Sequence, residues 1–68
     1  MSAEIIANGN KITTDLPCSI YEFLERLNLM PKSGVVELNQ EAVSPSQFID
    51  IQLKDGDKME IVKIVAGG

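Results

Sequence analysis

The chain has 68 residues, one cysteine, no histidine and a formal net charge of -4. This length allows one small domain, which we expect to span residues 1–68, and a lone thiol provides neither a disulfide framework nor the usual zinc ligands. The acidity disfavours nucleic acid and anionic membranes as partners, and no apolar run exceeds three residues, so we expect a cytoplasmic protein without a membrane-spanning segment.

The first two predicted elements are strands joined by a tight turn. Residues 4–7 and 11–14 are rich in residues that favour strands, and they flank Asn8-Gly9. Both turn residues tolerate a positive φ, which makes this pair the strongest short hairpin signal. We expect the hairpin to close at Leu16-Pro17, because proline lacks the N–H that a continuing strand needs.

A short helix is predicted to follow the hairpin. Ser19 and Glu22 have the spacing of a capping box, in which each side chain accepts a hydrogen bond from the backbone N–H of the other residue. Apolar residues then recur at the spacing of one helix face: Ile20, Phe23, Leu24 and Leu27. The helix is expected to end near Asn28, because Pro31 lies just beyond it.

Short strands and turns are predicted for the second half of the chain. Residues 35–38 form a strand and residues 41–43 its short return strand, with a turn at Asn39-Gln40 between them. Residues 44–47 are expected to form a turn or a single helical turn, and residues 54–57 a tight turn. The apolar side chains expected to face the core here are Val36, Leu38, Phe48, Ile51 and Leu53.

The last strand, predicted from residue 58 onward, changes its hydrophobic phase along its length. Met59 and Ile61 share one face, whereas Val62 and Ile64 share the other, with Lys63 between them. Three interpretations are open: a strand buried on both faces, an exposed docking patch at Val62 and Ile64, or a bulge near Val62.

The order β-β-α-β-(short β)-β predicts an α+β fold. A hairpin, a crossing helix and a closing strand describe a β-grasp, the ubiquitin-like mixed sheet packed on one main helix. The closing strand is expected to lie centrally beside the first one, which leaves residues 65–68 as a flexible tail that ends in Gly67-Gly68. Because Gly67 and Gly68 have no Cβ atoms, this end of the tail is thin enough to thread into a narrow site of another protein, although small chain ends also fray.

Four segments in this order and spacing match one known family. They are the opening hairpin with Asn8-Gly9, residues 36–43 with the pattern V-x-x-N-x-x-x-V, residues 54–62 with Asp55-Gly56-Asp57, and the terminal Gly67-Gly68. Together they resemble the ThiS family of ubiquitin-like sulfur carriers of thiamine biosynthesis. The chain departs from that pattern in its short lead-in to the helix, at 17–19, and at Ala66, where many members have glycine.

The resemblance implies a covalent carrier rather than an enzyme. In this family an E1-like adenylating enzyme of the ThiF type uses ATP and Mg²⁺ to activate the terminal carboxylate. A sulfur donor such as a cysteine desulfurase then displaces AMP, and the resulting thiocarboxylate delivers sulfur to a thiazole synthase of the ThiG type. Carried over to this chain, Gly68 bears the adenylate and thiocarboxylate, and Gly67 and Ala66 thread the tail. We expect no catalytic residue, metal site or bound cofactor in the chain itself, and a monomer when it is alone.

Docking on these partners is expected to involve the sheet face beside the tail. The candidate residues are Glu60, Val62, Lys63, Ile64 and Val65, and periodicity alone leaves a core role equally open for the apolar ones. Three other functions stay open. They are a carrier like the small subunit of molybdopterin synthase, a modifier joined to lysines through Gly68, and an interaction module with an inert tail.

Three residue types suggest other roles that we do not expect here. Cys18 is interpreted as a small, partly buried residue at the helix start rather than a sulfur-transfer thiol. Asp55 and Asp57 are interpreted as turn residues rather than metal ligands, because Gly56 lies between them. Met59 and Met30 are interpreted as core or cap contacts.

Overall fold

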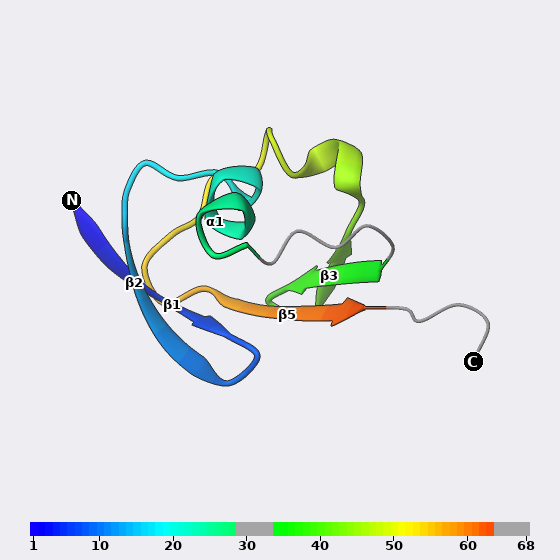
Figure 1. Cartoon of the computed structure of the whole chain (residues 1–68), viewed down its shortest axis with the longest axis horizontal. Coiled ribbons are helices and arrows are strands. Elements are labelled where there is room, and N and C mark those ends of the chain that lie inside the picture. Colours follow the sequence, from blue (N-terminus) through cyan, green and yellow to red (C-terminus); the bar gives the residue numbers. More distant parts are fainter. Residues whose placement is uncertain (29–33, 64–68) are drawn as a thin grey trace.

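The computed structural model describes residues 1–28 and 34–63, which form a mixed sheet with a helix against one face (Figure 1). Its elements are β1 (Ser2–Ala7), β2 (Asn10–Asp15), α1 (Ile20–Arg26), β3 (Gly34–Leu38), β4 (Glu41–Val43), the 3-10 helix η1 (Pro45–Gln47) and β5 (Lys58–Lys63). Within the described residues the sheet has five strands in the order β2-β1-β5-β3-β4. β5 is parallel to β1 and antiparallel to β3, so the last strand is central and the predicted β-grasp is confirmed.

The opening hairpin forms as predicted and is longer than expected. β1 and β2 pair from Ser2↔Asp15 to Ala7↔Asn10, which leaves Asn8-Gly9 as a two-residue turn. Asn8 has φ +50° and Gly9 φ +82°, the backbone conformation that a primed hairpin turn requires. Local turn chemistry therefore determines the register of this pair.

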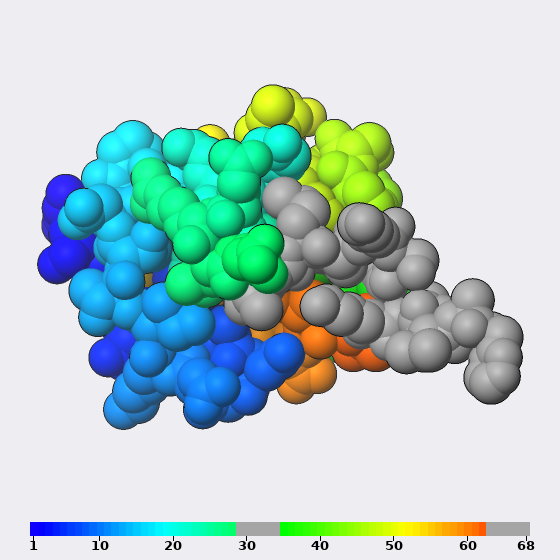
Figure 2. Space-filling view, viewed as in Figure 1, coloured from blue at the N-terminus to red at the C-terminus, as the bar shows by residue number. Residues whose placement is uncertain are grey.

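The helix is held at its start by the predicted capping box. Ser19 Oγ accepts from the Glu22 N–H at 3.1 Å, and Glu22 Oε1 accepts from the Ser19 N–H at 3.2 Å. The α-helix ends at Arg26, slightly before the predicted end, and Asn28 has φ +56°. In the space-filling view α1 lies against the β1–β2 hairpin (Figure 2), and Arg26 Nη1 donates to Thr14 Oγ1 at 3.1 Å across this contact.

The core lies between α1 and the inner face of the sheet. Its buried members are Ile5, Ala7, Cys18, Ile20, Phe23, Leu24, Val36, Val43, Phe48, Leu53, Met59 and Ile61. The irregular stretch after η1 closes this core, as predicted. It bonds to the helix start, because the Ile20 N–H donates to Ile51 C=O at 3.0 Å and the Leu53 N–H to Cys18 C=O at 2.8 Å.

The pairing of β5 with β3 decides between the three interpretations of Val62 that the sequence left open. β3 and β5 pair without interruption from Leu38↔Met59 to Gly34↔Lys63, so there is no bulge in this part of β5. Met59 and Ile61 face the core, whereas Val62 is 52% exposed. Burial of Val62 on the second face is therefore excluded, and Ile64 lies outside the described residues.

The turn between β3 and β4 carries two side chains at positive φ. Leu38↔Glu41 is the last pair of these strands, and Asn39 has φ +52° and Gln40 φ +71°. Asparagine enters this region readily, but glutamine does so at a cost. The Gln40 position therefore stores backbone strain that glycine would release.

We expect Gln40→Gly to stabilise the fold by about 0.5–1 kcal/mol, because glycine adopts this φ without strain. For a domain of this size the midpoint of thermal unfolding should rise by several degrees, roughly 2–8 °C. Circular dichroism melting checks this. Gln40→Ala is the matched control, since alanine also removes the side chain but keeps the strain. Equal midpoints for the two variants would contradict the argument.

Candidate functional site

The sequence places the candidate chemistry at the end of the chain. The structure describes the sheet and helix that precede this end, up to Lys63. Residues 64–68 lie outside the described residues, so the predictions for Ile64, Val65, Ala66, Gly67 and Gly68 are not tested by it. Lys63 is the last residue of β5 and pairs with Gly34 of β3. The described part of the chain therefore ends on the central strand of the sheet (Figure 1).

The face of the sheet opposite α1 carries an exposed apolar pair next to this exit. Val62 of β5 lies directly across from Val35 of β3, and their side chains are 52% and 37% exposed. Sequence reasoning proposed Val62 and missed Val35. The alternation in residues 35–38 already directs Val35 outward, but nothing local says which residue of another strand lies opposite.

Two carboxylates border this apolar pair. Glu60 of β5 lies directly across from Glu37 of β3. Like charges in directly opposite positions destabilise a sheet. In the described part of the chain the only ion pair joins Arg26 and Glu22 on α1, so neither carboxylate forms an ion pair with a described cation. We call Val35, Glu37, Glu60 and Val62 together the outer-face cluster.

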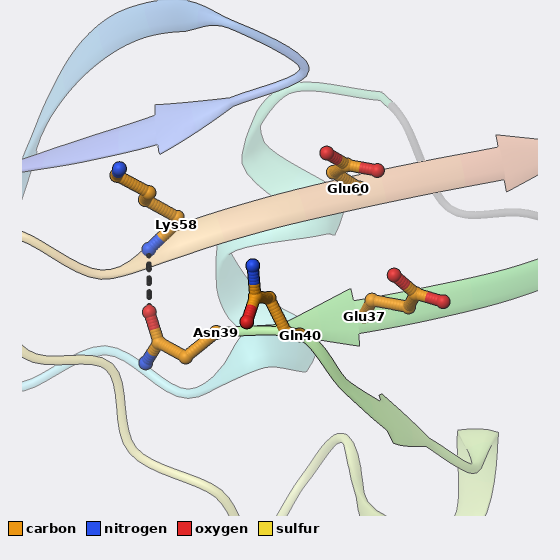
Figure 3. A pocket seen from close by; sticks show the side chains of 5 residues that line it. All are labelled: Glu37, Asn39, Gln40, Lys58 and Glu60. Atoms are coloured by element: carbon orange, nitrogen blue, oxygen red, sulfur yellow. Dashed lines mark hydrogen bonds between the residues drawn. The ribbon is translucent and has the colours of Figure 1, made fainter.

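An open polar hollow adjoins the start of β5 (Figure 3). It has a volume of about 420 Å³ and is lined by Glu37, Asn39, Gln40, Lys58 and Glu60. Asn39 closes one side, where its Oδ1 accepts from the Lys58 N–H at 3.0 Å. Among residues 1–28 and 34–63 no group of three or more side chains is placed to hold a metal ion. The hollow therefore shares Glu37 and Glu60 with the outer-face cluster.

The aspartates of the predicted turn serve the backbone, as expected. Asp55 Oδ1 accepts from the Glu4 N–H at 2.8 Å, and Asp57 Oδ2 accepts from the Lys54 N–H at 2.7 Å. These bonds attach the turn to β1 and close it on itself. Gly56, between them, has φ +89°.

Cys18 is more deeply buried than predicted. The expectation of a partly buried residue is wrong: its side chain is fully buried in the core, beside the capped start of α1. Its Sγ lies 3.5 Å from Arg26 Nη1. A thiol in this position is not presented to a partner, which agrees with a packing role.

No helix in the described part of the chain is long and apolar enough to cross a membrane.

Comparison with known proteins decides the family. The model of the ThiS family matches residues 3–68, which includes the terminal Gly67-Gly68. The chain belongs to the ThiS family. This membership supports a role as a sulfur carrier in thiamine biosynthesis, and proteins of the ThiS family work with thiazole synthase.

The chain is also similar to two relatives and two solved structures. A thiazole synthase of Paramagnetospirillum magneticum is 29% identical over 65 residues, covering 96% of this chain, and the chain spans only 20% of that protein's length. An uncharacterized protein of Pyropia yezoensis, ycf40, is 33% identical over 61 residues, covering 90% of this chain and 86% of that protein.

The crystal structure of the thiamine biosynthesis protein ThiS from Geobacter metallireducens has a TM-score of 0.80 at 29% identity, covering 96% of this chain and 99% of that one. The solution structure of a thiamine biosynthesis protein from the same organism has a TM-score of 0.74 at 29% identity, covering 96% and 87%. The likeness extends over nearly the whole chain, so the ThiS β-grasp describes the fold.

Proposed function

We propose that this chain carries sulfur on its carboxyl terminus for the formation of the thiazole of thiamine. Gly68 is adenylated and then converted to a thiocarboxylate, which a thiazole synthase consumes. The observation that carries the proposal is the match to the ThiS family through the last residue, Gly68. The end of β5 supports it, because the residues that follow in sequence are preceded by the exposed side chain of Val62.

The chemistry needs an activated carboxylate, because a free carboxylate is a poor electrophile. An oxygen of Gly68 attacks the α-phosphorus of ATP, pyrophosphate leaves, and a mixed anhydride with AMP remains. Hydrosulfide, the simplest donor, then attacks the carbonyl carbon, the bond to the AMP oxygen breaks, and a thiocarboxylate and AMP are formed. ATP and Mg²⁺ belong to the activating enzyme, so this chain acts as a cosubstrate.

The proposed partners follow from these steps. An E1-like enzyme of the ThiF type adenylates the tail, a donor such as a cysteine desulfurase supplies sulfur, and a thiazole synthase of the ThiG type receives it. The thiazole synthase among the relatives supports the last of these, since a segment of it is similar to this chain. We place the reaction in the cytoplasm and the free carrier as a monomer, without nucleic acid or membrane.

The outer-face cluster is the proposed docking surface for these partners. Exposed Val35 and Val62 offer apolar area at the end of β5 from which the tail leaves. Glu37 and Glu60 border it with negative charge, which suits a partner that presents a basic side chain. Lys63, Ile64 and Val65 continue this surface in our proposal.

We expect Val62→Lys to lower the rate of sulfur loading by roughly tenfold at carrier concentrations well below KM, because truncating or charging a central apolar contact typically costs more than 1 kcal/mol of binding. Ile49→Lys is the matched control, since Ile49 is also exposed, at 66%, and the charge change is the same. Both variants should unfold close to the parent temperature. Equal loading by both would remove Val62 from the docking surface.

The proposed pathway is tested with purified partners. The chain is incubated with ATP, sulfide and a ThiF-type enzyme, and then with a ThiG-type synthase and its other substrates. Formation of the thiazole in step with loss of the thiocarboxylate is the expected result. Loading without consumption would favour another sulfur pathway, such as molybdopterin synthesis. A lysine adduct linked through Gly68 would instead indicate a protein modifier.

A further inference from the structure

β5 loses its β1 partner after its first two residues. The two parallel strands pair only at Ile6↔Lys58 and Ala7↔Met59, because β1 ends at Ala7 and the chain turns into β2. β5 continues to Lys63. From Ile61 onward the strand therefore needs another source of hydrogen bonds on the β1 side.

The side chain of Asn8 supplies those bonds. Asn8 Oδ1 accepts from the Ile61 N–H at 2.7 Å, and Asn8 Nδ2 donates to Ile61 C=O at 3.4 Å. The Asn8 backbone N–H donates to Met59 C=O at 2.9 Å. A carboxamide has the donor and acceptor of a peptide group, so Asn8 extends the β1–β5 ladder by one more residue with its side chain.

Asparagine suits this position for two reasons that act together. Asn8 is the first residue of the hairpin turn and has φ +50°, a conformation that asparagine, aspartate and glycine adopt most readily. Of these three, only asparagine carries both a donor and an acceptor on its side chain. Turn formation alone does not require the carboxamide, because Gly-Gly also forms such turns.

We propose that Asn8 is a positioning residue, which holds the end of β5 in register so that Val62 and the start of the tail are presented to the activating enzyme. The proposal rests on the proposed function. Without the Asn8 bonds, the pairs that hold the end of β5 among the described residues are all on the β3 side, at Val36↔Ile61, Val35↔Val62 and Gly34↔Lys63. The partner would then have to order this segment on binding, which weakens binding without changing the chemistry at Gly68.

Asn39 provides a matched control at the other end of the same strand. It has φ +52°, its N–H donates to Lys58 C=O at 2.7 Å, and its Oδ1 accepts from the Lys58 N–H at 3.0 Å. It therefore holds the start of β5 from the β3 side, as Asn8 holds the end from the β1 side. Lys58 and Ile61 are roughly 10 Å apart along the strand, and Asn39 is not part of the outer-face cluster.

The test compares Asn8→Gly, Asn8→Asp and Asn39→Gly by amide hydrogen exchange and by the kinetics of thiocarboxylate formation. In Asn8→Gly we expect the Ile61 amide to exchange roughly tenfold faster, and the KM of the activating enzyme for the carrier to rise by roughly the same factor with kcat retained. Asn8→Asp keeps the acceptor for the Ile61 N–H, so it should give intermediate values. Asn39→Gly should expose the Lys58 amide instead and raise KM by much less than Asn8→Gly, because Asn39 lines the hollow beside Glu37 and Glu60 but does not bond to the end of β5.

Hydrogen exchange tests the Asn8–Ile61 bonds, and the KM of the activating enzyme tests their effect on docking. Unchanged exchange at Ile61 in Asn8→Gly would show that the side-chain bonds do not hold the strand. Faster exchange with unchanged KM would overturn the positioning role, and an equal rise of KM in Asn39→Gly would reduce it to general destabilisation. If the parent chain is never loaded, the proposed function fails and the positioning role with it, whereas the exchange data still decide whether Asn8 holds β5.

Discussion

Replacing Gly68 with valine, or deleting it, is expected to abolish sulfur loading, by at least about a hundredfold, and to leave the fold intact. A β-branched side chain crowds attack at the terminal carbonyl, and deletion moves the carboxylate back by one residue, away from the bound ATP. A misplacement of this order is enough to remove most of a positioned reaction. The core members among the described residues lie between Ile5 and Ile61, so neither change alters one of them.

The measurement is thiocarboxylate formation with a ThiF-type enzyme, ATP and sulfide, next to thermal unfolding of each variant. Unfolding midpoints close to the parent value are expected, since changes away from packed or bonded groups usually cost less than about 0.5 kcal/mol. Gly68→Ala is the graded control and should retain part of the activity. A Gly68-deletion variant that is loaded like the parent would show that the terminal residue does not carry the chemistry.

Replacing Phe23 with alanine is expected to have the largest effect on stability. Phe23 is 1% exposed and lies on the helix face that fills the core. A Phe→Ala change in a core typically costs about 3–5 kcal/mol. A chain of this length has a total stability of roughly 3–10 kcal/mol, so the change removes a large part or all of it.

Urea unfolding followed by circular dichroism measures this effect. Tyr21 offers the matched control, because it is an aromatic residue of the same helix that is 41% exposed. Tyr21→Ala should cost well under half as much as Phe23→Ala. If both variants lose the same stability, the assignment of Phe23 to the inner face and Tyr21 to the outer face of α1 is wrong.

The features that the sequence predicted well depend on neighbouring residues. The Asn8-Gly9 turn and the Ser19–Glu22 capping box are local, so their geometry follows from residue types at fixed spacing. The apolar spacing of α1 likewise identified Phe23 and Leu24 as core residues. With the strand order, these local features were enough to predict a β-grasp.

The features that were missed depend on pairing between distant segments. Val35 and Glu37 belong to the outer-face cluster only because β3 and β5 pair in one register, and local periodicity does not contain that register. The bonds from Asn8 to Ile61 join residues 53 positions apart. The sequence marks Asn8 as a turn residue, and only the arrangement of β1 beside β5 gives its side chain a second role.

The depth of burial of Cys18 was also beyond sequence reasoning. Its position before the helix indicates a small residue, and the stretch that closes the core covers it, with the Leu53 N–H donating to Cys18 C=O at 2.8 Å. The family pattern, in contrast, reaches Gly68, although the structural description stops at Lys63. The proposed chemical role of the tail is therefore inferred from the sequence and its relatives, whereas the outer-face cluster is identified from the structure.

The central claim is that the carboxylate of Gly68 receives sulfur. Oxygen-to-sulfur exchange nearly coincides in mass with oxidation of one of the three methionines, so the intact mass alone is ambiguous. After incubation with ATP, sulfide and a ThiF-type enzyme, the chain is therefore alkylated and cleaved after Lys63. The released peptide, residues 64–68, contains neither methionine nor cysteine. An ATP-dependent alkylated form of this peptide is the predicted result. A tail that stays unmodified with several such enzymes, under conditions that load an established ThiS protein, would contradict the account.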